Sequence, residues 1–202
     1  MKLWIVTGGI ATGKSQFCKC LQHRARPDEL RLVSADEIVH QAYENPAVCM
    51  RIAEELGIVP RSEHCGTALR KTVRDRIRAA PELRKTLEAI LHPIVWEQRQ
   101  IIADRAKAEG IKVLVAEIPL YYETGTALAA DQVIVVAASR GVQVSRLQSK
   151  RALDALASQD MLAMQMPLEQ KIERADVVIW NDGSVSALEN QAHLLLRQAN
   201  LL

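Results

Sequence analysis

Residues 8–15, GGIATGKS, place glycine, lysine and serine at a spacing that can hold phosphate. Gly8, Gly13, Lys14 and Ser15 fit the pattern G-x-x-x-x-G-K-[ST], in which backbone amides of a glycine-rich loop surround an anion. Lysine then reaches the terminal phosphates of a nucleotide, and the serine hydroxyl binds Mg²⁺. We expect the nucleotide-binding residues to be Gly8, Gly9, Ile10, Ala11, Thr12, Gly13, Lys14, Ser15 and Gln16, with Ser15 also the metal ligand.

The surroundings of the loop favour this interpretation over a glycine-rich turn that matches by chance. The apolar run Leu3–Val6 precedes it and predicts a strand, and the segment SQFCKCLQHRA predicts a helix that ends before Pro27. A strand, the loop and a helix in this order aim the positive end of the helix dipole at the bound phosphate.

Five short apolar runs predict strands near residues 2–7, 31–34, 112–118, 132–138 and 176–180. Several are continuous rather than alternating, as in KVLVAEI and QVIVVAA, which is typical of parallel strands covered on both faces. Helical segments lie between them. The pattern predicts an α/β fold with a five-stranded parallel sheet.

The interval between the second and third runs holds only helical patterns, so we expect a helical insertion. Pro46, Pro81 and Pro93 stand where they can begin helices. We expect one domain over 1–202, with a core of about 1–36, 111–138 and 166–202, an insertion over about 37–110, and a helical lid over about 139–165.

Composition limits the classes of function. The 202 residues are 49% hydrophobic, enough for a sizeable core, and a net charge of +2 with 3% aromatic residues does not favour nucleic acid as a partner. No apolar run approaches the roughly 18 residues that cross a bilayer, and no cleavable signal is visible at the N-terminus. We expect a cytoplasmic protein without a membrane partner, a monomer or weak homo-oligomer, whose four cysteines are reduced and mostly buried.

Two carboxylates follow predicted strands at the edge where open α/β sheets bind ligands. Asp36, in VSADEIV, can take a proton from an attacking hydroxyl or hold a Mg²⁺-bound water; equally, it can be the N-cap of the next helix. Glu117, in VAEIPLYYETG, can be a magnesium or substrate ligand beyond the first shell, and a structural role in the turn to Pro119 fits as well.

Basic residues gather in two further segments. Residues 61–85 hold eight Lys or Arg and three Asp or Glu; such a run is usually a solvated helix face, but it can also bind an anionic acceptor. A second group follows the fourth strand, where cations of a kinase lid neutralise the transferred phosphoryl group. Its members are Arg140, Arg146, Lys150 and Arg151.

Two polar turns have open interpretations. Asn181 and Gly183, in the turn after the fifth strand, can border an adenine or form an ordinary turn before the last helix. His92 precedes Pro93 at an expected helix start, where a lone histidine is more often structural than catalytic.

These segments together resemble the dephospho-coenzyme A kinase family, in order and over nearly the whole chain. Beside the loop, SADEIVHQ resembles the family's D-A-D-x-I segment, and PELRKTLEAILHPIV its L-E-A-I-x-H-P signature. EIPLYYETG, QVSRLQSKR and QMPLEQKIERADVVIWNDGS resemble its P-L-L-[FY]-E, lid and Q-M-P-x-x-x-K…N-x-G segments.

The resemblance implies transfer of a phosphoryl group from Mg·ATP to the ribose 3′-hydroxyl of dephospho-CoA, the last step of coenzyme A synthesis. Asp36 matches the proposed base, and Lys14 and Arg146 match the residues that hold the transferring group. Residues expected at the acceptor are Asp36, Arg70, His92, Glu117 and Pro119. This chemistry needs positioning and electrostatics rather than a covalent intermediate.

The chain departs from the family pattern at several positions. Ser34 replaces the first Asp of D-A-D, and Lys150 replaces the second lid arginine, so that a point charge stands where a guanidinium fork is expected. Glu117 stands for Asp, Met161 for a frequent Arg and Arg78 for a usual Phe. Since Lys14, Ser15, Asp36 and Arg146 are retained, we expect activity.

Two alternatives remain at this point. One is another small-molecule kinase on the same scaffold, acting on a nucleoside, nucleotide or sugar. The other is a catalytically weak nucleotide-binding relative with an altered lid. A GTPase is disfavoured, since the chain has neither a D-x-x-G nor an N-K-x-D motif.

Overall fold

The computed structural model describes residues 1–59, 65–123, 129–151 and 154–202, with the backbone alone at 150 and 151. It divides the chain into two compact units. The first consists of Met1–Val33 and Arg105–Leu202, and the second of Ser34–Asp104. The expected insertion over about 37–110 and lid over about 139–165 were drawn from sequence and stay predictions.

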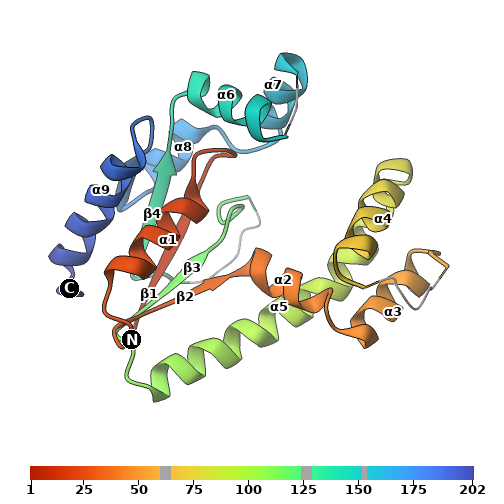
Figure 1. Cartoon of the computed structure of the whole chain (residues 1–202), viewed down its shortest axis with the longest axis horizontal. Coiled ribbons are helices and arrows are strands. Elements are labelled where there is room, and N and C mark those ends of the chain that lie inside the picture. Colours follow the sequence, from red (N-terminus) through yellow and green to blue (C-terminus); the bar gives the residue numbers. More distant parts are fainter. Residues whose placement is uncertain (60–64, 124–128, 152–153) are drawn as a thin grey trace. The chain divides into compact units, whose positions relative to one another are not determined.

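The first unit is a parallel sheet covered by helices (Figure 1). The strand order is β2-β3-β1-β4-β5, and β1 is paired in parallel with β3 on one side and β4 on the other. The strands are β1 (Lys2–Gly8), β2 (Leu30–Ser34), β3 (Val113–Glu117), β4 (Gln132–Ala137) and β5 (Val177–Trp180). The helices are α1 (Lys14–Arg24), α6 (Arg140–Arg151), α7 (Ala155–Ala163), α8 (Leu168–Glu173) and α9 (Val185–Gln198). The predicted α/β fold with a five-stranded parallel sheet is therefore confirmed.

Helices α1 and α9 lie side by side and share one core with the sheet (Figure 1). Trp4 and Val6, two residues apart on β1, point to the same face because side chains alternate along a strand. They pack with Phe17 of α1 and Leu188 of α9, all nearly inaccessible to water. Burial of this face fixes the end of β1 and the start of α1, and hence the loop between them.

The second unit is helical and has a core of its own. Its elements are α2 (Ala35–Ala42), α3 (Pro46–Glu55), α4 (Gly66–Ala79) and α5 (Leu83–Ala108), of which the last four residues belong to the first unit. Ile52, Leu69 and Ile90, from three different helices, are almost fully buried together. Asn45 caps α3 by accepting hydrogen bonds from two backbone amides of its first turn, and Pro46 begins the helix as expected.

The expectation that Pro93 begins a helix is wrong, because Pro93 lies inside the long helix α5. Proline removes one backbone donor and leaves the carbonyl of Ala89, four residues earlier, without its helical partner. Both residues are exposed, so that water can satisfy this oxygen. Ile90 and Leu91 are buried in the core of the second unit, and this packing outweighs the local cost of proline.

Among the described residues, no helix combines the length and the apolar character that crossing a membrane requires. Even α5, with 26 residues, carries charged side chains in both its first and its second half.

Replacing Phe17 by Ala tests the core beneath the loop. Phe17 is 0% exposed, and emptying such a site costs about 3–5 kcal/mol of unfolding free energy. Denaturant unfolding followed by circular dichroism measures this loss. Leu194→Ala is the control, since Leu194 is 55% exposed and its truncation is expected to change stability by less than about 0.5 kcal/mol. Equal losses for the two variants would contradict the assigned core.

Candidate active site

The candidate site is built on the loop that joins β1 to α1. Gly8 has φ +145°, and a Cβ there would lie 2.1 Å from the carbonyl oxygen of Val136. Gly13 has φ +96°, and its Cβ would lie 2.3 Å from the side-chain nitrogen of Asn181. Only glycine fits either place, for steric reasons that the sequence motif already suggested.

The carbonyl oxygens of the first half of the loop all accept hydrogen bonds from side chains. Lys14 Nζ donates to Gly9 O at 2.6 Å and to Gly8 O at 3.4 Å. Lys171 Nζ also donates to Gly8 O, at 3.3 Å, and Gln143 Nε2 donates to Ile10 O at 2.7 Å. These donors come from α1, α8 and α6.

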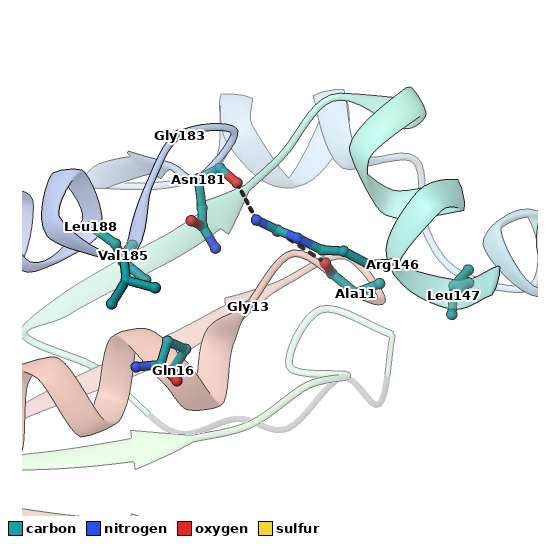
Figure 2. A pocket seen from close by; sticks show the side chains of 9 residues that line it. All are labelled: Ala11, Gly13, Gln16, Arg146, Leu147, Asn181, Gly183, Val185 and Leu188. Atoms are coloured by element: carbon teal, nitrogen blue, oxygen red, sulfur yellow. Dashed lines mark hydrogen bonds between the residues drawn. The ribbon is translucent and has the colours of Figure 1, made fainter. Parts of the chain in front are cut away.

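Arg146 and Asn181 donate to carbonyl oxygens of the second half of the loop. Figure 2 shows the contacts of Arg146 with Ala11 and Asn181. The Arg146 guanidinium donates to Ala11 O and Thr12 O at 3.3 Å each and to Asn181 O at 2.8 Å. Asn181 Nδ2 donates to Thr12 O at 2.7 Å, and Gly13 O accepts from the backbone nitrogen of Phe17. Every carbonyl oxygen from Gly8 to Gly13 thus has a partner.

Within the described part of the chain, the backbone amides of residues 9–13 donate to no other backbone group, which leaves them for an anion. Ala11 has φ +58°, a strained value for a residue with a Cβ, and Gly13 also has positive φ. Backbone that alternates between negative and positive φ points successive N–H groups into one concave nest, which attracts anions. The start of α1 adds the positive end of its dipole.

A cavity of about 280 Å³ opens beside the loop (Figure 2). Its lining is Ala11, Gly13, Gln16, Arg146, Leu147, Asn181, Gly183, Val185 and Leu188. Ala11, Gly13, Gln16, Asn181 and Gly183 were predicted to bind the nucleotide. Apolar walls with a few polar groups are typical of small-molecule sites.

Ser15 and Glu117, predicted from separate segments, meet directly. Ser15 Oγ donates to Glu117 Oε1 at 2.7 Å. Glu117 is 6% exposed and pairs in register with Val6 of β1. Pro119 supports the turn that follows, since its carbonyl oxygen accepts from Thr7 Oγ1 at 3.3 Å. The pair offers two oxygen atoms at the base of the loop, the kind of ligand that Mg²⁺ takes.

Three of the predicted acceptor residues, Asp36, Arg70 and His92, belong to the second unit. Asp36 is exposed in the first turn of α2, whose N-cap is Ser34, so the N-cap interpretation of Asp36 is wrong. Arg70 lies 3.2 Å from His40 Nδ1 and over the ring of Tyr43. Burial raises the pKa of the Tyr43 hydroxyl. His92 is exposed on α5. Their roles toward an acceptor stay predictions.

Of the four predicted lid cations, Arg140 and Arg146 have side chains that the structure describes. Arg140 is exposed at the start of α6, and Arg146, further along the same helix, holds the loop. The side chains of Lys150 and Arg151 lie outside the described residues.

The sequence interpretation missed three residues that hold or support the loop. Gln143 binds the loop directly, and Lys171 does so while its Nζ also contacts Glu123 Oε1 at 2.6 Å. Lys171 stands in QMPLEQK and Glu123 in YYETG, segments used only for their resemblance. Lys171 lies between Gln170 and Ile172 in a short helical segment, where no local pattern marks it as buried.

Two comparisons of sequence agree on one family. The family model described as CoaE, dephospho-CoA kinase, matches residues 3–187. A dephospho-CoA kinase of Anaeromyxobacter dehalogenans is 38% identical over 199 residues, covering 97% of this chain and 91% of the relative.

Solved structures show the same fold. TT1252 from Thermus thermophilus matches with a TM-score of 0.74 at 26% identity, covering 100% of this chain and 98% of that one. Dephospho-CoA kinase from Campylobacter jejuni matches with a TM-score of 0.66 at 22% identity, covering 98% and 96%. The likeness at 22% identity supports the fold alone.

Asp182, in the turn that carries Asn181, makes the stability of the fold depend on pH. Its Oδ1 accepts from Ser139 N at 2.7 Å and its Oδ2 from Trp180 Nε1 at 3.1 Å. The hydrogen bond from the Ser139 backbone holds the pKa of this carboxyl below its ordinary value. A lowered pKa means that the carboxylate stabilises the fold above the unfolded pKa, and that this contribution is lost as pH falls through the folded pKa.

We therefore expect Asp182→Asn to lower the urea midpoint at pH 7, and we expect this difference from the parent protein to shrink as the pH falls below about 3.9, the pKa of aspartate in an unfolded chain. Urea unfolding in a series from pH 7 downwards measures both. Asp28→Asn, at an exposed aspartate in another loop, is the control. A difference that grows on acidification would contradict the assignment.

Proposed function

Because the chain belongs to the dephospho-CoA kinase family, we propose that it transfers the γ-phosphoryl group of ATP to the ribose 3′-hydroxyl of dephospho-CoA. The products are coenzyme A and ADP, and the reaction is the last step of coenzyme A synthesis. The observation that carries the proposal is the loop of residues 8–13, whose carbonyl oxygens are all bonded and whose amides are left for phosphate. Family membership supplies the acceptor.

ATP fits the groups around the loop. We assign the phosphates to the loop amides and Lys14, and the base to the cavity lined by Gln16, Asn181 and Gly183. Lys14 now donates to the carbonyl oxygens of Gly8 and Gly9, so it must turn away from them to reach a phosphate.

Mg²⁺ fits the oxygen pair of Ser15 and Glu117. This ion usually keeps several waters and takes only one or two protein oxygens together with the substrate phosphates. We assign Ser15 Oγ as the protein ligand and Glu117 as its hydrogen-bond partner, which orients the hydroxyl. When bound, the ion neutralises charge on the phosphates.

The chain's own residues then supply positioning and charge. Arg146 has five N–H donors, more than its three contacts to the loop and Asn181 use, so it can hold the loop and contact a phosphoryl oxygen together. Asp36 is assigned to accept the proton of the acceptor hydroxyl, and Arg70, beside His40 and Tyr43, to bind the anionic acceptor. No covalent enzyme intermediate is needed.

The acceptor is tested by ADP release from Mg·ATP with dephospho-CoA, beside adenosine, AMP and pantetheine 4′-phosphate. We expect turnover with dephospho-CoA alone and its loss, by at least about 10²-fold, in Lys14→Ala, because a preorganised positive charge on the phosphates is removed. Turnover with another acceptor would support kinase activity but refute dephospho-CoA as the acceptor. ATP binding without turnover on any acceptor would make the chain a nucleotide-binding relative.

Asp36→Asn tests the assigned base separately. A missing general base lowers kcat by about 10²–10⁴-fold, while ATP affinity, measured by calorimetry, stays unchanged because Asp36 is not assigned to the nucleotide. Glu37→Gln, at the next exposed carboxylate of α2, is the matched control and should keep full activity. Equal activity of Asp36→Asn and the parent protein would remove Asp36 from the mechanism.

A further inference from the structure

Lys171 is a charged side chain with no access to water. It is 0% exposed on the short helix α8. A buried ammonium group is costly unless it is paired and hydrogen-bonded, and an apolar residue of similar size would often stabilise the fold as well. The position of this lysine therefore calls for a reason other than packing.

Its two contacts join Glu123 to the phosphate loop. Lys171 Nζ lies 2.6 Å from Glu123 Oε1 and donates to Gly8 O at 3.3 Å. Glu123 Oε1 also accepts from the backbone nitrogen of Met166 at 3.2 Å, two residues before α8 begins. The carboxylate neutralises the ammonium group and fixes it under the loop.

Gly8 O is shared by two lysines. Lys14 Nζ lies 3.4 Å from it and Lys171 Nζ 3.3 Å. Gly8 is buried at the end of β1 and pairs in register with Val136 of β4, and this strand pairing holds its backbone in place. Among the described residues, the side chains that donate to this oxygen are Lys14 and Lys171, so that it depends on Lys171 when Lys14 leaves for a phosphate.

We propose that Lys171 is a positioning residue for nucleotide binding: it keeps the Gly8 carbonyl bonded when Lys14 moves from the loop to the phosphates. Without Lys171, each binding event leaves a buried backbone oxygen without a donor, and this penalty lowers ATP affinity. The inference rests on the proposed binding of ATP to this loop and does not depend on the identity of the acceptor.

A double-mutant cycle on ATP affinity separates this role from a structural one. We expect Lys171→Met to weaken ATP binding by about tenfold in the parent background, the order expected for one buried acceptor left without a donor. In a Lys14→Met background no lysine has to leave Gly8 O, so adding Lys171→Met should change the affinity by less than about twofold. A purely structural lysine would cost the same in both backgrounds, and that result would overturn the proposal.

The measurement is calorimetric titration with ATP, without acceptor, so that a wrong acceptor leaves it unaffected. If ATP does not bind even the parent protein, the proposed function fails; if it binds and the cycle is additive, only the role of Lys171 fails. Lys19→Met, an exposed lysine on α1, is the matched control and should leave affinity unchanged.

The parent protein gives a second test should Lys171→Met not fold. The ¹⁵N signal of the Lys171 ammonium group should persist on addition of ATP with slow exchange of its protons, while the Lys14 signal shifts. Loss of the Lys171 signal on ATP binding, with Lys14 unchanged, would overturn the proposal.

Discussion

A chain that turns its amide groups toward an anion must point its carbonyl oxygens the other way, and each of those oxygens then needs a donor of its own. In residues 8–13 this demand is met in full. The donors are side chains of Thr12, Lys14, Gln143, Arg146, Lys171 and Asn181, together with one backbone amide of α1. The rest of the first unit serves to bring these groups to one loop.

The demand explains why so many contacts of the site are distant in sequence. Asn181 follows β5, Arg146 and Gln143 stand on α6, and Lys171 stands on α8, all more than 120 residues after the loop. The parallel sheet brings them together, because β4 is paired with β1 and β5 with β4, so that their carboxyl ends reach the same edge. A cation that holds a loop carbonyl also stands close to the ligand, so Arg146 and Lys14 can serve the structure and the chemistry in turn.

Much of this could be predicted from the sequence, since it depends on local patterns. The loop motif, the five strands and the parallel sheet follow from spacing and from continuous apolar runs. Ser15 and Glu117 were each placed at the ligand-bearing edge of the sheet from their own motifs, and in the structure a hydrogen bond joins them. The continuation of a helix through Pro93 was not predicted, because it depends on the burial of Ile90 and Leu91 against other helices, which no local pattern reveals.

The donors that hold the loop were the hardest to predict. Asn181 and Arg146 were singled out, but for contact with the ligand rather than with backbone oxygens. Lys171 and Gln143 were not singled out, since a lysine or glutamine in a helical segment looks like a solvated residue until the fold buries it. The acceptor roles of Asp36, Arg70 and His92 rest on resemblance to the family and stay proposals.

The central claim is that the loop is arranged for phosphate before any phosphate binds. Backbone ¹⁵N relaxation of residues 9–13 in the nucleotide-free protein tests it most directly. The account predicts order parameters of about 0.85 across the loop, as in rigid backbone, with little change on addition of ATP. Values below about 0.6 that rise only when ATP is added would contradict it, since the ligand and not the side-chain donors would then order the loop.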